Sequence, residues 1–206
     1  MSEELKIFDK KRNEIGVAQR DQVHIHGYWH ETFHCWFVDK KDGVNHIYFQ
    51  KRSDVKKDYP NLLDITAAGH ILSNESVSDG IREVREELGI NVEMEELIPL
   101  GIIEDCIISN SFIDREFGHV YVYHMKDKDT FILQQEEVSG IAKTRFDDFF
   151  DLCLGEKDTI KIEGFEINEF GKTFNYIKSV SLNEFVPHQR TYLENVAKLI
   201  ADNLRS

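Results

Sequence analysis

The sequence predicts a single mixed α+β domain, and three observations support this prediction. Residues 29–37 alternate large apolar and polar side chains, a pattern typical of a β-strand, and further β-prone runs follow them. Residues 78–90 and 191–205 instead carry apolar side chains at helical spacing. No internal repeat, low-complexity tract or proline-rich linker divides the 206 residues, of which only 3 are proline. One domain with a C-terminal extension is therefore the simplest interpretation.

The first half of the chain is predicted to be mostly extended. The β-prone runs are residues 5–8, 29–39, 46–52 and 62–71. Polar connections separate them, at residues 9–16, 40–45 and 53–61. The middle connection has Asp-Gly at its centre, so the strands on either side of it are expected to form a hairpin. Residues 17–26 fit either a strand or a short helix.

The clearest helix begins near Ser78, which we expect to be its N-cap. Ile81, Val84 and Leu88 form one apolar stripe along it. Gly89 is expected to end this helix in the left-handed conformation. Two β-rich runs come next (96–108 and 117–125), then a short helix (145–155), two short β or loop pieces (161–170 and 174–181) and the amphipathic terminal helix.

Composition excludes several classes of protein. Apolar residues make up 41% and charged residues 31%, which is typical of a globular chain and not of disorder. No stretch approaches eighteen consecutive apolar residues, and the charged start lacks the apolar region of a secretory signal, so no membrane partner is expected. The 3 cysteines are far apart in the sequence and form no CxxC pair, which suits a reducing, cytoplasmic location.

The formal net charge of −13 makes binding to a nucleic acid duplex unfavourable. An acidic protein that handles phosphate groups needs a metal ion or a local patch of basic side chains. Candidate sites are therefore places where carboxylates gather in a pattern that suits a cation.

One such place is the helix after residue 78. Glu83 and Glu87 lie one turn apart on one face, roughly 6 Å along the axis, and Glu86 flanks them. Arg82 and Arg85 offset part of the repulsion between these carboxylates. A rigid acidic cluster suits a hard divalent cation such as Mg²⁺ or Mn²⁺. On spacing alone, a solvated helix surface explains the pattern equally well.

The surrounding string resembles the Nudix box: Gly, five residues, Glu, seven residues, then Arg-Glu-apolar-x-Glu-Glu-x-Gly-apolar. Gly69 and Glu75 match the first part, and residues 82–90 match the second, so nine fixed positions agree. The sequence departs from the pattern once, because six residues and not seven separate Glu75 from Arg82. The shortening leaves the carboxylate spacing intact and puts the usual bracing role of Glu75 in question.

The resemblance implies a Nudix-type α/β/α sandwich with a mixed β-sheet. We expect the box at residues 69–90 within a Nudix domain at 29–170, preceded by a β-rich lead-in at 1–28. Residues 171–206 would form a C-terminal extension that ends in the amphipathic helix. This extension would either cover one edge of the sheet or pair with a second subunit in a homodimer.

The resemblance also implies hydrolysis of a nucleoside diphosphate linked to another moiety, a small-molecule diphosphate. Glu83 and Glu87 would then bind Mg²⁺, with Mn²⁺ as a substitute, and Glu86 and the Gly69 carbonyl would assist. Arg82 belongs to the same expected catalytic set. A general base often comes from a loop outside the box, and the candidates are Glu136 and Glu137, with Glu116 as a weaker one. Each of these three glutamates is equally consistent with an ordinary surface acid.

Residues 5–140 also resemble bacterial Nudix proteins related to isopentenyl-diphosphate isomerase. His30 and the Gly69-His70 pair match positions where the isomerase has metal-binding histidines. The isomerase needs a cysteine directly before its Gly-His pair, and this chain has Ala68 there. Loss of that thiol favours a hydrolase over an isomerase. A non-catalytic module that senses a nucleotide is the remaining alternative.

The histidines are a separate set of candidate metal ligands. His30 and His34 are four residues apart in a predicted strand, about 13 Å along its axis, which is too far to share one ion directly. His70 is expected to contact substrate phosphate or to cap its loop. For the other histidines we expect structural or solvent-facing roles.

Overall fold

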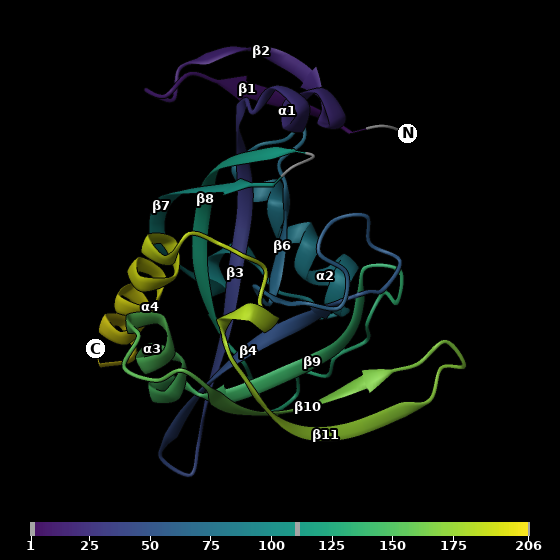
Figure 1. Cartoon of the computed structure of the whole chain (residues 1–206), viewed down its shortest axis with the longest axis vertical. Coiled ribbons are helices and arrows are strands. Elements are labelled where there is room, and N and C mark those ends of the chain that lie inside the picture. The colour runs from purple at the N-terminus through teal and green to yellow at the C-terminus, as the bar shows by residue number, and fades with distance from the viewer. Residues whose placement is uncertain (1–2, 110–111, 206) are drawn as a thin grey trace.

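A sheet of eleven strands forms the framework of the protein, described by a computed structural model over residues 3–109 and 112–205 (Figure 1). The strands are β1 (Glu4–Phe8), β2 (Glu14–Gln19), β3 (Trp29–Lys41), β4 (Val44–Arg52), β5 (Leu63–Asp64), β6 (Ala67–His70), β7 (Leu97–Ile108), β8 (Ile113–His124), β9 (Val138–Arg145), β10 (Ile160–Ile167) and β11 (Thr173–Val180). β3 contacts β1, β4, β6 and β8, and only its pairing with β8 is parallel among these. The mixed sheet expected from the resemblance is therefore confirmed.

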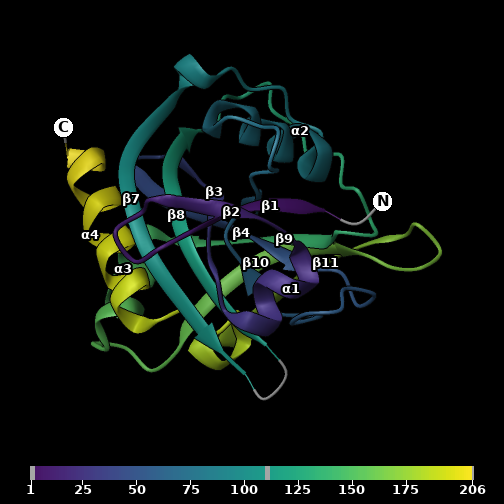
Figure 2. The ribbon, with the colours of Figure 1, turned by 90° about the horizontal axis from the view of Figure 1, so that it is seen from above.

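Four α-helices and three short 3₁₀ helices join the strands. The helices are α1 (Arg20–His26), η1 (Val77–Ile81), α2 (Arg82–Leu88), η2 (Met94–Glu96), α3 (Phe146–Leu154), η3 (Leu182–Glu184) and α4 (Arg190–Arg205). The main path through the sheet runs β11-β10-β9-β4-β3-β1-β2. α2 lies on one side of the central strands, and α3 and α4 lie together on the other (Figures 1 and 2). The predicted sandwich of helices around a sheet is thus present.

β3 is buried on both faces, which differs from the half-exposed strand that its alternating pattern suggests. Phe33 and Phe37 pack with Val84 of α2 in one core, whereas Trp36 packs with Phe149 of α3 in the other. The polar positions between them are buried too, including His30, Thr32 and His34. Buried polar groups need partners, so these side chains are the first sign of a functional site inside the fold.

Two local predictions differ from the structure. Residues 40–45 are not a six-residue loop, because β3 and β4 continue to a two-residue turn at Asp42 and Gly43, both with positive φ (51° and 79°). A two-residue turn of this kind matches the twist of the strands it joins. β9 was not predicted at all. It lies between β4 and β10, and its sequence, VSGIAKTR, has neither strict alternation nor a run of β-branched residues.

The C-terminal extension is built into the main core. β10 and β11 form an antiparallel hairpin beside β9, and the predicted terminal helix is α4, whose apolar stripe includes Tyr192, Val196 and Ile200. These side chains pack with Trp36 of β3 in one cluster. Across the described ranges, no helix is long and apolar enough to cross a membrane.

We expect Ile200→Ala to lower the free energy of unfolding by about 2–5 kcal/mol, because it removes a side chain that is fully buried in the core. The matched control is Lys198→Ala on the exposed face of the same helix, whose ion pair with Glu194 spans 3.6 Å. This control should stay within about 0.5 kcal/mol of the wild type in urea unfolding. Equal losses for both variants would mean that α4 does not depend on its buried stripe.

Candidate active site

The box segment folds as a 3₁₀ turn followed by an α-helix. The N-cap of the 3₁₀ turn is Ser76 and not the predicted Ser78. The Ser76 backbone N–H donates to Asp79 Oδ2 (2.8 Å), and the Ser76 hydroxyl donates to the same oxygen (2.7 Å). The N-cap prediction was therefore wrong by two residues, because an irregular first turn precedes the regular helix. Gly89 ends the helix with φ of 70°, as predicted.

The 3₁₀ turn (Val77–Ile81) lies in the shortened stretch between Glu75 and Arg82. Arg82 nevertheless reaches Glu75, to which its Nε donates at 2.7 Å and its Nη2 at 3.1 Å. The bracing contact of Glu75 survives the shortening.

Arg82 is the centre of the box. Its Nη1 donates to Glu83 Oε1 (2.5 Å) and Glu86 Oε2 (3.1 Å), and its Nη2 also donates to the His70 carbonyl (3.1 Å). The hydrogen bond to Glu75, with the charges of the other carboxylates, raises the pKa of the guanidinium despite its partial burial. Arg82 thereby ties the loop before the box to its helix and stays charged.

Two carboxylates of α2 are withdrawn from solvent: Glu87 is buried and Glu83 is half-buried. Glu87 is 6% exposed, and its Oε2 accepts from Gln50 Nε2 and the Ala68 N–H, both at 3.3 Å. Burial, followed by the charge of Glu83, raises the pKa of Glu87 well above its ordinary value. Burial is also the main cause that raises the pKa of Glu83, to about 7, against the opposing charge of Arg82. A divalent cation between them would relieve the unfavourable charge on both.

Gly69 lies directly against the Glu83 side chain, so that a Cβ at this position would collide with the carboxylate. The glycine of the box is thus explained by close packing. Glu86 is half-exposed and contacts Arg82 only at the rim. The oxygen-rich donor set of Glu83 and Glu87 fits Mg²⁺ or Mn²⁺, which favour oxygen ligands.

The box carboxylates open into a cavity of about 970 Å³. The base candidates Glu136 and Glu137 both line it. Glu137 forms an ion pair with Lys56, and its charge contributes to the raised pKa of Glu87, whereas Glu136 is exposed. Glu137 therefore interacts electrostatically with the box carboxylate Glu87. Glu116 lines the same cavity but is held elsewhere, by His34 at 3.3 Å.

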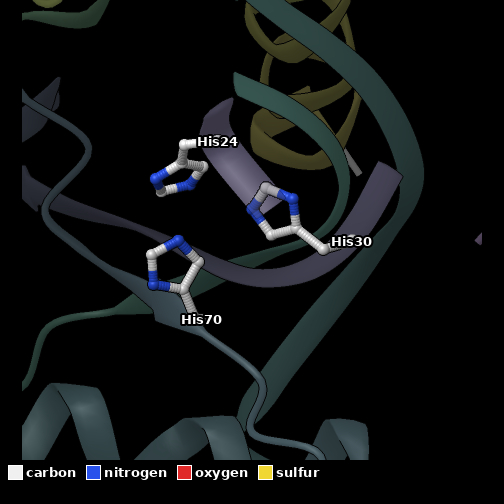
Figure 3. A group of neighbouring side chains, drawn as sticks. All are labelled: His24, His30 and His70. Atoms are coloured by element: carbon white, nitrogen blue, oxygen red, sulfur yellow. The ribbon is translucent and has the colours of Figure 1, made fainter. Parts of the chain in front are cut away.

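Three histidines converge beside this cavity, and one of them, His70, lines it. The rings of His24, His30 and His70 face one another with centroids 5.1–5.4 Å apart (Figure 3). Asp114 Oδ1 lies 3.5 Å from His24 Nε2 and 3.4 Å from His30 Nε2. None of these three buried atoms has a hydrogen-bond partner among the described residues. Unsatisfied buried polar atoms are rare, and several that converge suggest a missing ligand.

The chemistry of this cluster fits a transition metal. Burial, reinforced by the charge of His70, lowers the pKa of His24 to about 4 and that of His30 to about 3, so both rings are neutral at physiological pH. Neutral imidazoles with one or two carboxylates form a common site for Zn²⁺ and its neighbours. Ligand atoms of His30, Asp114 and Glu116 also lie within 4.8 Å of one another, as do those of the three histidines.

Sequence reasoning missed this cluster. His70 was expected to meet substrate phosphate, and His24 and His30 were assigned structural roles. The available signal was the match of His30 and His70 to metal-binding histidines of the isomerase. No spacing pattern pointed to His24 or Asp114, because α1, β3, β6 and β8 bring these side chains together over long sequence distances. His34, as expected, shares no direct site with His30 and instead contacts the Tyr192 hydroxyl (2.7 Å).

Five cationic side chains also line the cavity, and each of them forms an ion pair with a carboxylate. They are Arg20, Arg52, Lys56, Lys57 and Arg82. They come from segments that surround the box and not from the box alone. Opposite charges are thus arranged around one space: carboxylates that suit a cation, and cations that suit a phosphate group.

Comparison with known proteins identifies the class of protein to which this fold and site belong. The NUDIX domain matches residues 28–161. An uncharacterised Nudix hydrolase of Clostridium acetobutylicum is 40% identical over 205 residues, which cover 98% of this chain and 100% of that protein. The chain therefore belongs to the Nudix family and is a Nudix hydrolase.

Weaker relatives include an isopentenyl-diphosphate Delta-isomerase of Photorhabdus laumondii, which is 29% identical over 140 residues (68% of this chain and 75% of that protein). Among solved structures, DR0079 from Deinococcus radiodurans matches 75% of this chain and 91% of its own with a TM-score of 0.56 at 19% identity. A MutT protein from Methanosarcina mazei matches 85% and 95% with a TM-score of 0.50 at 14% identity. These structures support the fold alone.

We expect Glu87→Gln to stabilise the metal-free protein by about 1–3 kcal/mol at a pH of about 8, since it removes a buried charge. The raised pKa values mean that the metal-free fold binds protons more tightly than the unfolded chain. Its stability should fall as pH rises from the ordinary value of 4.5 through the Glu83 pKa of about 7. Thermal unfolding with EDTA and with Mg²⁺ tests this, because Mg²⁺ should stabilise the wild type and not the variant. Equal Mg²⁺ stabilisation of both proteins would exclude Glu87 as a ligand.

We expect His30→Gln to reduce the content of transition metal in the purified protein by about tenfold or more, because it removes a buried imidazole ligand. Elemental analysis after dialysis against Zn²⁺, with Mg²⁺ present to occupy the box, measures this directly. His26→Gln is the matched control, since His26 is an exposed histidine of the same region that lies outside the cluster. Unchanged metal content in His30→Gln would show that the cluster binds no transition metal.

Proposed function

We propose that this Nudix hydrolase is Mg²⁺-dependent and cleaves a pyrophosphate bond in a nucleoside diphosphate derivative or a similar small molecule. One observation carries the proposal: the Glu83 and Glu87 carboxylates face a large cavity that is also lined by basic side chains. Cation ligands and phosphate-binding groups in one space suit a metal-bound diphosphate. Mn²⁺ is expected to replace Mg²⁺, since both accept oxygen ligands.

Each side chain has a role in this proposal. Glu83 and Glu87 would hold the ion, with Glu86 and the Gly69 carbonyl beside them. Arg82 would keep Glu83 in place, and Gln50 and the Ala68 N–H would do the same for Glu87. The bound ion would supply Lewis-acid charge stabilisation at the phosphoryl oxygens. Arg52 and Lys56 would neutralise the diphosphate from the facing wall. Glu137, with Glu136 as the alternative, would accept the proton of the attacking water while the P–O bond of the bridge breaks.

An isomerase is the second candidate, favoured by the similarity to isopentenyl-diphosphate isomerases and by the histidine cluster. Two features count against it. Ala68 stands where the isomerase has its cysteine, and none of the 3 cysteines of the chain lines the cavity. Burial raises the pKa of the Cys35 and Cys153 thiols, the latter to about 12, so neither is an accessible acid or base. The charged wall of the cavity also suits a polar moiety better than a hydrocarbon tail.

The proposal also covers the cellular location of the enzyme and its oligomeric state. We place it in the cytoplasm because its cysteines are free and two of them are buried as thiols. A homodimer would use the outer edge of β11, where Phe174 and Ile177 are exposed. A non-catalytic sensing module remains the third candidate, and substrate turnover separates it from the hydrolase.

Hydrolysis of a panel of nucleoside diphosphates, triphosphates, sugar nucleotides and dinucleotides, with and without Mg²⁺, tests the proposal. We expect turnover of at least one substrate, lost with EDTA. Glu83→Gln and Glu87→Gln should lower kcat by at least about 10²-fold, since metal-held charge stabilisation is worth several kcal/mol. Glu75→Gln, which loses only the brace, should cost less.

The matched control for these variants is Glu95→Gln, which changes an exposed glutamate outside the cavity and should turn over at the wild-type rate. No turnover anywhere on the panel would favour the sensing module. Interconversion of the two C5 diphosphates would favour the isomerase. Wild-type rates in both Glu83→Gln and Glu87→Gln would mean that the box is only a scaffold.

A further inference from the structure

The segment between η3 and α4 enters the cavity from the C-terminal extension. Val186 and His188 both line the cavity. The Val186 N–H donates to the Leu63 carbonyl (2.8 Å), so the segment is held beside β5 by the backbone. The NUDIX domain match ends at residue 161, and this segment lies beyond it. Residues outside the matched region thus form part of the wall of the proposed active site.

His188 is held between two buried carboxylates. Its Nδ1 lies 2.6 Å from Asp105 Oδ2, and its Nε2 lies 2.9 Å from Asp64 Oδ1. Because both partners are acceptors, both ring nitrogens must carry protons and donate. Burial disfavours the charged ring, but the hydrogen bonds from both carboxylates outweigh it and raise the pKa of His188 to about 10. With both nitrogens engaged, His188 is a fixed imidazolium and has no free position for acid–base chemistry.

The second oxygen of Asp64 continues this network into the cavity. Asp64 Oδ2 accepts from Arg52 Nη1 at 2.8 Å, and the Asp58 carbonyl accepts from Arg52 Nε and Nη2 at 3.2 and 3.0 Å. Burial opposes ionisation of Asp64, yet His188 and Arg52 together lower its pKa to about 2. The result is a line of alternating charges, Asp105, His188, Asp64 and Arg52, that runs from the core to the cavity wall.

We propose that His188 is a positioning residue: by neutralising Asp64 and Asp105 from the core side, it fixes Arg52 in the orientation that binds the diphosphate of the substrate. The proposal depends on the balance of charge in this network. Asp64 and Asp105 are 5% and 1% exposed, and His188 contacts both of them, whereas Arg52 contacts Asp64 alone. Without the imidazolium, Asp64 would depend on Arg52, which would be drawn inward and have less charge available to a phosphate. The assignment of Arg52 to phosphate binding rests on the proposed function.

A double-mutant cycle tests the proposal, with methylenediphosphonate as a diphosphate probe that is not hydrolysed. Its affinity in the presence of saturating Mg²⁺ is measured by calorimetry for the wild type, His188→Gln, Arg52→Gln and the double variant. We expect His188→Gln to weaken binding about tenfold and Arg52→Gln by at least as much. The double variant should bind within about twofold of Arg52→Gln, because His188 acts through Arg52.

The control is Thr144→Val, which removes a buried hydrogen bond (Thr144 Oγ1 to the Lys161 carbonyl, 2.8 Å) away from the cavity. It should lower the melting temperature without changing the affinity. If His188→Gln does not fold, His188→Asn takes its place. This change also removes the imidazolium, leaves Asp64 and Arg52 unchanged, and should cause a similar loss of affinity.

Additive losses in the double variant, or wild-type affinity in His188→Gln or His188→Asn, would overturn the proposal. So would a wild-type protein that does not bind the probe. The proposed function is judged separately by turnover: an enzyme that hydrolyses its substrate but shows no coupling between His188 and Arg52 refutes only this inference. Coupled binding without turnover of any substrate refutes only the hydrolase.

Discussion

The proposed site depends on holding two carboxylates, the half-buried Glu83 and the buried Glu87, one helical turn apart. Burial raises the pKa of both, and the charge of Glu83 adds to the cost of ionising Glu87. The fold makes this arrangement tolerable in two ways: Arg82 lies against Glu83, and Gly69 leaves the space that the Glu83 carboxylate occupies. The remaining imbalance is the kind that a bound divalent cation removes. Without a bound cation, the two ionised carboxylates of the box would therefore carry an electrostatic cost.

The rest of the cavity follows from the same constraint. An acidic protein with a net charge of −13 needs local positive charge to admit a diphosphate. In the proposed function, Arg52 and Lys56 would supply it from β4 and the loop after it, where each is paired with a carboxylate of the wall. His188 would extend this balance into the core, so that the C-terminal extension would contribute to the site as well as to packing. The histidine cluster would be a second, nitrogen-rich site whose metal preferences differ from those of the oxygen-rich box.

Much of this could be predicted from the sequence where the signal is local. The box, the helix stripe of Val84 and Leu88, and the left-handed end at Gly89 all depend on residues within two helical turns, and each was confirmed in the structure. The start of the helix at Ser76 was missed because an irregular 3₁₀ turn precedes it. The histidine cluster and the His188 network could not be predicted, because their members come from strands and helices far apart in the chain. Their partnership is created by the sheet, in which β3 lies beside β6 and β8.

The central claim is that Glu83 and Glu87 hold the divalent ion of the reaction. Diffraction from crystals soaked with Mn²⁺ and methylenediphosphonate, recorded at the manganese edge, tests it most directly, since anomalous scattering locates the ion without reference to activity. The account predicts a manganese peak coordinated by oxygens of both carboxylates and by the diphosphonate. A peak confined to His24, His30 and His70, with none beside Glu83 and Glu87, would contradict it.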